Sequence, residues 1–241
     1  MCIRDRLNTD NINITGESFD YGPYRFLPRL DPNFTAAYFD QSGLYAFGRQ
    51  PEAVFWNLQQ LAGTLVELTE QSALIAALQD YSRVLAQAVE DRLFRRLGLL
   101  ASGDRDTDQR FLQAFLAALK TSGLSFDETL HRAFGGRAWP QGDDWREVSG
   151  MAAGFAVDRP ERLDHPYFRA DRPTSLVIEE IEALWDPIAE KDDWSAFEQK
   201  LADTRTMAQA YGFSPIVADE GQKALAAAQG QAEATGAAAQ P

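Results

Sequence analysis

Apolar residues recur every three or four positions along most of the chain after Pro51, and this period is the strongest constraint on its fold. Such spacing gathers apolar side chains on one face of a helix, where another element can cover them. Pro51 itself suits the first turn of a helix, because the missing N–H would have no partner there. The first two runs are Val54, Leu58, Leu61 and Leu65, and then Leu74, Ile75, Leu78, Tyr81, Leu85, Val89, Leu93 and Leu97 before Gly98.

Further helices are predicted beyond Gly98. Phe111, Phe115 and Leu119 mark a helix that the sequence Thr-Ser-Gly ends. Ser125 and Glu128 have the spacing of a capping box, so a short helix should begin there.

The pattern then breaks at the Gly, Pro and Trp residues of 134–145, before two more helices in 174–188 and 192–211. Pro187 should end or kink the first of these. Together these segments predict a mostly α fold.

Residues 7–50 have a different character, rich in Asn, Asp, Gly, Pro and aromatic residues, with no sustained period. Their aromatic residues are too many for a solvated linker, so we expect these loops to be pinned onto the helices. Residues 213–241 are dominated by Ala, Gln, Gly and Glu and are predicted to be a disordered tail. The chain is therefore divided into a loop-rich segment (7–50), a helical body (51–212) and a tail (213–241).

Charge and hydropathy narrow the possible partners. A formal net charge of −13 over 241 residues argues against nucleic acid and against anionic membrane surfaces. The sequence has no apolar run long enough for a membrane span and no pattern typical of a signal peptide, so a cytoplasmic location is expected. The single cysteine, Cys2, excludes an internal disulfide and a cysteine-based zinc site.

Two groups of side chains in the helical body have simple interpretations. Trp139, Trp145, Trp185 and Trp194 are interpreted as packing residues rather than as a ligand-binding box. The acidic run Glu179, Glu180 and Glu182 lies on a predicted helix and should form a solvated face.

The candidate chemistry lies in the loop-rich segment. Asp10, Asn11 and Asp20 offer hard oxygen donors, the ligands that Mg²⁺ or Mn²⁺ prefers when it is held against phosphates. Protein kinases use a catalytic-loop Asn and the Asp of an Asp-Phe-Gly motif in this way. Asn11 would take the first role and Asp20, in Asp-Tyr-Gly, the second. The alternative is structural, because Asn and Asp are also common in turns.

The segment from Leu7 to about Ala62, LNTDNINITGESFDYGPYRFLPRLDPNFTAAYFDQSGLYAFGRQPEAVFWNLQQLA, resembles the signature segment of the SelO family, also called YdiU, of pseudokinase-like protein adenylyltransferases. The resemblance continues more weakly through DRLFRRLGLL, DQRFLQAFLAAL and SFDETLHRAF. It implies a helical C-terminal part of a protein-kinase-like fold, preceded by a loop-rich metal and nucleotide segment. The implied reaction transfers AMP from ATP to Ser, Thr or Tyr hydroxyls of proteins.

The resemblance also implies roles for individual residues. Asp10 would be the catalytic base, Asn11 a metal ligand, and Asp20 a ligand of both the metal and the nucleotide. Mg²⁺ or Mn²⁺ would be the cofactor, with ATP and proteins bearing hydroxyl side chains as substrates.

The resemblance further implies a nucleotide-binding part upstream of the Asn-Thr-Asp-Asn motif. We therefore expect the chain to be a C-terminal fragment, inactive alone, with residues 1–6 as a non-native head. The family's Cys-containing tail has no counterpart here, because no Cys follows Cys2. The alternative function is a non-catalytic helical domain whose aromatic loops bind a partner protein.

Overall fold

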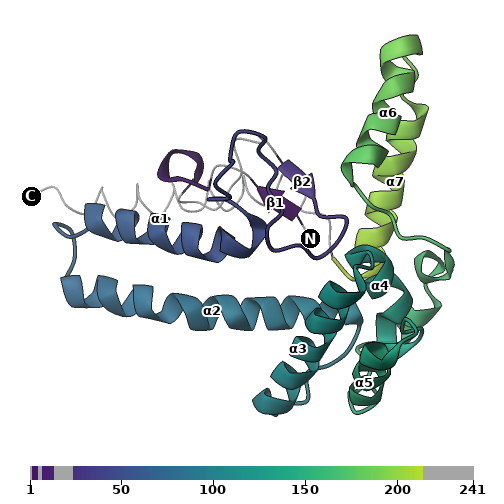
Figure 1. Cartoon of the computed structure of the whole chain (residues 1–241), viewed down its shortest axis with the longest axis horizontal. Helices are drawn as coiled ribbons and strands as arrows, with labels where there is room; N and C mark the ends of the chain where they lie inside the picture. Colours follow the sequence, from purple (N-terminus) through teal and green to yellow (C-terminus); the bar gives the residue numbers. More distant parts are fainter. Residues whose placement is uncertain (1, 5–6, 14–23, 214–241) are drawn as a thin grey trace, which may run out of the picture.

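The computed structural model describes residues 2–4, 7–13 and 24–213 of the chain, and helices dominate this part (Figure 1). The α-helices among the described residues are α1 (Gln50–Thr64), α2 (Gln71–Leu97), α3 (Arg105–Ser122), α4 (Phe126–Ala133), α5 (Asp143–Ala152), α6 (Ile178–Lys191) and α7 (Ser195–Ala210). Short 3-10 helices are η1 (Thr9–Asn11), η2 (Phe47–Arg49), η3 (Phe134–Gly136), η4 (Pro160–Asp164) and η5 (Pro166–Arg169). The predicted mostly α class is confirmed.

Two short strands complete the described secondary structure. β1 (Cys2–Arg4) pairs antiparallel with β2 (Tyr24–Phe26), with Ile3 opposite Arg25. The predicted tail lies outside the described residues except for Phe213, and the predicted ligand Asp20 lies outside them as well. None of the described helices combines the length and the apolarity that a transmembrane span needs.

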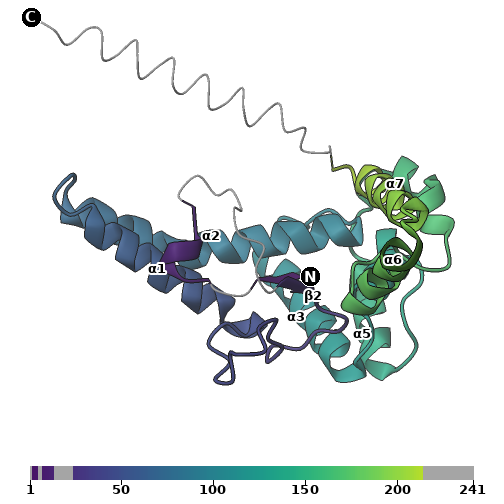
Figure 2. The same ribbon diagram turned by 90° about the horizontal axis from the view of Figure 1, so that it is seen from above.

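Helices α1 and α2 form an antiparallel hairpin (Figures 1 and 2). The rings of Phe55 and Tyr81 stack with their centres 5.4 Å apart, and the Tyr81 hydroxyl donates a hydrogen bond of 3.0 Å to the Pro51 carbonyl. Burial raises the pKa of the Tyr81 hydroxyl, which keeps it protonated and able to donate. These contacts fix the start of α1 on the middle of α2.

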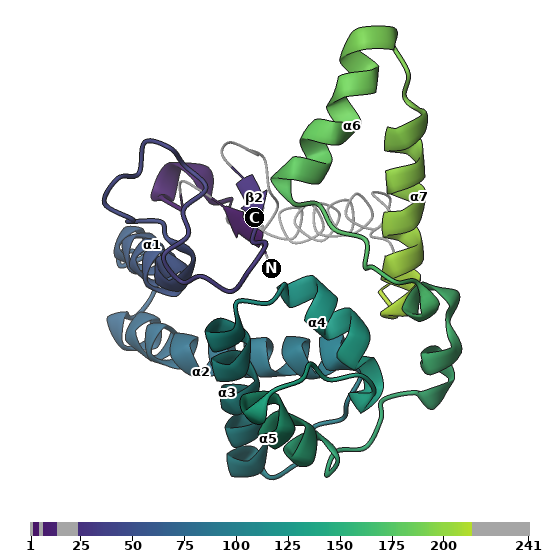
Figure 3. The ribbon, with the colours of Figure 1, turned by 45° about the vertical axis from the view of Figure 1, so that its right-hand side comes forward.

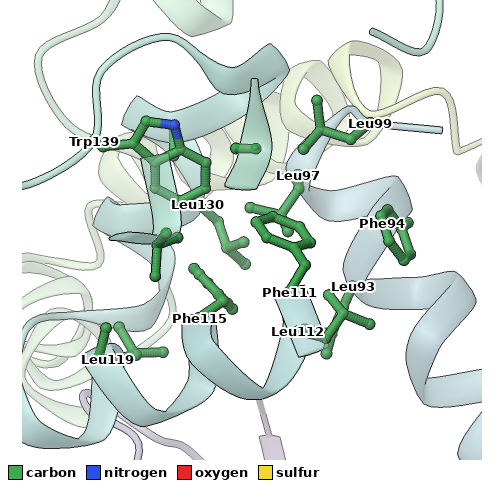
Figure 4. Close-up of a cluster of buried hydrophobic side chains, with 14 of the residues drawn as sticks. Leu93, Phe94, Leu97, Leu99, Phe111, Leu112, Phe115, Leu119, Leu130 and Trp139 are labelled. Carbon is green, nitrogen blue, oxygen red and sulfur yellow. The ribbon is translucent and has the colours of Figure 1, made fainter. Parts of the chain in front are cut away.

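The main hydrophobic core lies where the C-terminal end of α2 meets α3, α4 and α5 (Figure 4). Its buried side chains include Leu93, Phe94, Leu97, Phe111, Leu112, Phe115, Leu119, Leu130, Trp139, Trp145 and Val148. Phe115 is fully buried, and its ring centre lies 6.2 Å from that of Trp139 and 6.1 Å from that of Trp145. The packing role predicted for these two tryptophans is confirmed.

A second cluster attaches the end of α7 to this body. The rings of Phe134 and Phe168 stack 3.8 Å apart, and Tyr211 packs edge-on against both. The Arg95 guanidinium donates a hydrogen bond of 2.5 Å to the Gly212 carbonyl and lies 3.8 Å from the Phe213 ring centre. A cation beside carbonyls at a helix C-terminus is favourable, so Arg95 ties α7 to α2.

Helices α6 and α7 form a hairpin that stands away from the core (Figure 3). The sequence predicted that Pro187 would end or kink this helix. Pro187 lies inside α6, which continues to Lys191, so the helix does not end at the proline. The last turn survives because the N–H groups of Asp192 and Asp193 reach the carbonyls of Ile188 and Pro187. Only one hydrogen bond, near the end of the helix, is lost to the proline.

Local signals explain two further outcomes. The Ser125 side chain accepts a hydrogen bond from the Glu128 N–H, so the predicted capping position of α4 is confirmed. Helix α5 was missed, because its start follows the Gly-rich interruption. Asp143 and Asp144 in its first turn favour a helix N-terminus, and Trp145 begins its buried face.

Replacing Phe115 with Ala should lower the free energy of unfolding by about 3–5 kcal/mol, because a fully buried ring is removed and a cavity remains. Urea denaturation followed by circular dichroism measures the change. Val84→Ala, at a position 51% exposed on α2, is the control and should change stability by less than about 0.5 kcal/mol. A loss below about 1 kcal/mol for Phe115→Ala would contradict this core.

Candidate metal and nucleotide site

The segment 7–13 lies against α1, where it forms the 3-10 helix η1 (Figure 2). Asn57, in the middle of α1, is only 6% exposed. Its side-chain nitrogen donates hydrogen bonds to the Leu7 carbonyl at 2.5 Å and to the Ala53 carbonyl at 2.7 Å. A buried amide makes such bonds because leaving its N–H groups unpaired would be costly. Asn57 therefore clamps segment 7–13 onto α1.

Asn8 and Asn11 shape the turn that carries the predicted site residues. The Asn11 backbone N–H donates to the Asn8 carbonyl at 3.1 Å, and the Asn11 side-chain nitrogen donates to Asn8 Oδ1 at 2.6 Å. The nitrogen end of the Asn11 amide thus faces Asn8. Asn11 is half-buried, whereas Asp10 beside it is exposed to solvent.

A cavity of about 590 Å³ opens beside Asp10. Its walls combine polar and aromatic groups, among them Tyr45, Arg49, Glu52 and Trp56. This volume lies within the range of about 300–1,000 Å³ that is typical of small-molecule sites. The structure therefore places the predicted base at a cavity large enough for a small ligand.

A second cavity, of about 350 Å³, lies between segment 9–13 and α1. It is lined by Thr9 and Ile12 from the segment and by Val54, Leu58 and Leu61 from α1. The predicted apolar face of α1 therefore faces segment 9–13, but the side chains do not fill the space between them. Leu61 lines this cavity, and its side chain is therefore still 38% exposed.

The loop before α1 is held in shape largely by Asp40. Its carboxylate accepts hydrogen bonds from the Tyr45 N–H at 2.8 Å, the Leu44 N–H at 2.9 Å and the Ser42 hydroxyl at 3.1 Å. Slight burial acts to raise the pKa of Asp40, but these hydrogen bonds outweigh it and the pKa is lowered. Asp40 thereby positions Tyr45 at the cavity wall.

Close backbone contacts set the start of α1 against the same loop. Gly48 donates its N–H to the Pro32 carbonyl at 2.8 Å, and a Cβ at this position would lie 2.9 Å from the Pro32 Cβ. Only glycine allows this approach without displacement. The contact fixes Arg49, which follows directly, beside the cavity.

Arg49 and Trp56 are cavity residues that the sequence reasoning missed. Arg49 occupies the N-cap of α1, with its guanidinium 3.8 Å from the Glu52 carboxylate and its Nη1 3.3 Å from the Gly43 carbonyl. A cation at a helix N-terminus opposes the helix dipole, and that mismatch was the available signal. Trp56 lies on α1 and is 52% exposed. Its position in the sequence does not distinguish a cavity residue from one that packs in the core.

Among the described residues, no group of three or more His, Cys, Asp or Glu side chains is arranged to hold a metal ion. Asp10 and Asn11 lie side by side in η1. Asp20 lies outside the described residues, so its predicted role stays a prediction. The described part of the site contains one carboxylate and one amide of the predicted set.

These features define a mostly helical protein in which the Asp10 carboxylate is exposed at a cavity of small-molecule size. The family model described as "Protein adenylyltransferase SelO" matches residues 3–147, more than half of the chain. The chain therefore belongs to the SelO family.

Curated relatives agree with this membership. The chain is 35% identical over 220 residues to "Protein nucleotidyltransferase YdiU" of Synechocystis, covering 81% of this chain and 46% of the relative. It is 32% identical over 221 residues to the protein of that name from Trichodesmium erythraeum, covering 81% of this chain and 44% of the relative. The Albidiferax ferrireducens protein is 42% identical over 123 residues, covering 50% of this chain and 25% of the relative. The chain spans about half the length of the first two relatives.

Asn57→Asp should release segment 7–13, because an aspartate has no N–H to donate and its charge repels the Leu7 and Ala53 carbonyls. The expected loss of stability is about 1–3 kcal/mol. Hydrogen–deuterium exchange should accelerate at residues 7–13. Gln60→Glu, the same chemical change at an exposed position of α1, is the control. Unchanged exchange at Asn11 in Asn57→Asp would rule out the clamp.

Proposed function

We propose that this chain supplies the base and the metal-binding segment of a protein adenylyltransferase, which transfers AMP from ATP to Ser, Thr or Tyr hydroxyls of proteins. The observation that carries this proposal is the position of Asp10, exposed at a cavity of about 590 Å³ within the part of the chain that the family model matches. The names of the relatives support nucleotide transfer in general. The choice of acceptor hydroxyl rests on the resemblance alone.

In this proposal Asp10 acts on the acceptor hydroxyl. Its carboxylate orients the hydroxyl and accepts its proton as the oxygen bonds to the α-phosphorus, while the bond to pyrophosphate breaks. A carboxylate at the mouth of a cavity is suited to this role, because both the protein substrate and ATP must reach it. General base assistance of this kind contributes about 10²- to 10⁴-fold in rate.

Asn11 and Asp20 would hold Mg²⁺ or Mn²⁺. The donor set fits these ions, since hard cations prefer carboxylate and amide oxygens and Mg²⁺ keeps several waters, so few protein ligands suffice. A bound divalent cation supplies positive charge that stabilises the phosphate oxygens during transfer.

The helices from α1 onward are proposed to be the C-terminal part of a protein-kinase-like fold. Their helical content and the family membership support this assignment. Because the chain spans about half of its relatives, we propose that these 241 residues alone transfer AMP at a negligible rate. Nucleotide transfer depends strongly on how the reacting groups are positioned. The region that this chain shares with its relatives supplies part of that positioning.

The alternative function, a non-catalytic helical interaction domain, is favoured by one observation. Tyr38 is 91% exposed and Phe39 45% exposed on the loop before α1, with their rings in edge-to-face contact 5.4 Å apart. Exposed aromatic pairs are common anchors of protein interfaces. The two functions are distinguished by whether Asp10 affects AMP transfer.

The test uses a chimera in which residues 7–213 replace the matching region of the Synechocystis relative. With [α-³²P]ATP and Mg²⁺ the chimera should label proteins, whereas [γ-³²P]ATP should give no label. Asp10→Ala should lower the labelling rate about 10²- to 10⁴-fold with ATP affinity retained. Asp20→Ala should abolish metal-dependent ATP binding.

Glu67→Gln, an exposed carboxylate outside the site, is the control and should leave the rate unchanged. Label transferred from the γ-position would contradict AMP transfer. Full activity of Asp10→Ala would exclude Asp10 as the base.

A further inference from the structure

The α6–α7 hairpin carries an apolar groove of about 400 Å³ on its surface. Trp185 is 61% exposed and Trp194 46% exposed, so the packing interpretation of these two tryptophans is wrong. The side chains that line the groove include Ile181, Trp185, Ile188, Trp194, Phe197 and Leu201. Exposed apolar patches of this kind mark binding surfaces in soluble proteins.

The groove is built from two helix stripes. Ile181, Trp185 and Ile188 recur at spacings of four and three on α6. Trp194, the N-cap residue of α7, is followed at spacings of three and four by Phe197 and Leu201. The hairpin stands away from the main core, and α7 joins the body at its C-terminal end (Figure 3). Two parallel apolar stripes form the kind of groove that accepts a third helix.

Local contacts hold the Trp194 side chain in one conformation. Its indole N–H donates a hydrogen bond of 2.8 Å to Asp192 Oδ1, and its ring makes an edge-to-face contact with Phe197 at 5.7 Å. Asp192 has a φ of 52°, a left-handed conformation that ends α6 and turns the chain toward α7. A preorganised aromatic side chain loses less entropy on binding, which favours affinity.

The two helices that carry the groove are acidic, and the one charged side chain among the described residues that line the groove, Lys200, is paired with a carboxylate. Glu182 lies three residues before Trp185, and Glu198 lies four residues after Trp194 and three before Leu201, so each neighbours a groove residue on its helix. Both glutamates are exposed. Across 178–210 the chain has nine acidic and three basic side chains, a formal net charge of −6. One of the three cations, Lys200, is already paired with Glu180 at 2.5 Å.

Charge argues against three other occupants. A second copy of the hairpin would bring the same acidic helices against this one, and an anionic membrane surface would be repelled as well. The segment 214–241 carries Asp219, Glu220 and Glu233 against Lys223 alone, and its only large apolar side chain beyond Val217 is Leu225. None of the three complements an apolar groove on an acidic hairpin.

We propose that the α6–α7 groove binds a basic amphipathic helix of another protein, with its apolar face on the two tryptophans and its Lys or Arg residues beside Glu182 and Glu198. Helix-in-groove recognition supplies the affinity through the aromatic anchors. The acidic hairpin selects the partner by charge and speeds its association. This proposal does not depend on the proposed AMP transfer.

The test measures binding of a fluorescein-labelled synthetic helix of about 18 residues, with a leucine face and lysines elsewhere, to the 241-residue chain by anisotropy. A peptide with the same leucine face and glutamates in place of the lysines should bind at least about tenfold more weakly. Added salt should weaken binding of the lysine peptide.

Two variants separate the apolar and the charged contributions. Trp185→Ala combined with Trp194→Ala should weaken binding of the lysine peptide by about tenfold or more. Val84→Ala, at an exposed position of α2, is the control. Glu182→Lys combined with Glu198→Lys should weaken binding of the lysine peptide and strengthen binding of the glutamate peptide. Glu67→Lys combined with Glu147→Lys, two exposed positions on other elements, is the matched charge control. Far-ultraviolet circular dichroism checks that each variant is folded.

Three results would overturn the proposal. The first is equal affinity for the two peptides. The second is unchanged binding in the double tryptophan variant. The third is self-association of the chain in sedimentation experiments that the tryptophan substitutions abolish, because that result would assign the groove to a second copy.

Discussion

A single buried amide, that of Asn57, connects the candidate chemistry of this protein to its helical scaffold. Its hydrogen bond to the Leu7 carbonyl joins residues 50 positions apart and fixes segment 7–13 on α1. Helix α1 in turn rests on α2 through Phe55 and Tyr81, and the C-terminal end of α2 belongs to the main core. The position of Asp10 therefore depends on a continuous chain of contacts that ends in the packed body.

Charge is distributed unevenly over this acidic protein. Near the candidate site the cavity wall includes Arg49, whose cation is held beside Glu52. The α6–α7 hairpin, with a formal net charge of −6 over 178–210, presents acids around exposed tryptophans. One surface thus offers the Asp10 carboxylate at a cavity, and the other offers an apolar groove on an acidic hairpin. The two proposals use separate parts of the molecule, so each can fail without the other.

The sequence predicted the helical elements better than the contacts between them. Ser125 marks a helix start through a purely local hydrogen bond, so its role was readable from spacing. Pro187 does not end α6, because one missing hydrogen bond near a helix end is tolerated when the following N–H groups find other carbonyls. Helix α5 was hidden by the Gly-rich turn before it, although Trp145, Val148 and Ala152 follow a helical period. Asn57 gave no signal, since its partner lies 50 residues away.

The candidate site was predicted as a set of residue types, while its surroundings came from the structure. Asp10 and Asn11 stand out in the sequence as hard oxygen donors beside a turn, and their roles stay predictions. The cavity depends on Tyr45 and Arg49, which reach it only through the folded loop held by Asp40. The most direct measurement of the central claim is paramagnetic broadening of the amide NMR signals of the isotopically labelled chain by Mn²⁺ with ATP. Broadening that begins at residues 9–13 and at the Asn11 side-chain amide is the predicted result, and broadening confined to the acidic residues of α6 would contradict the account.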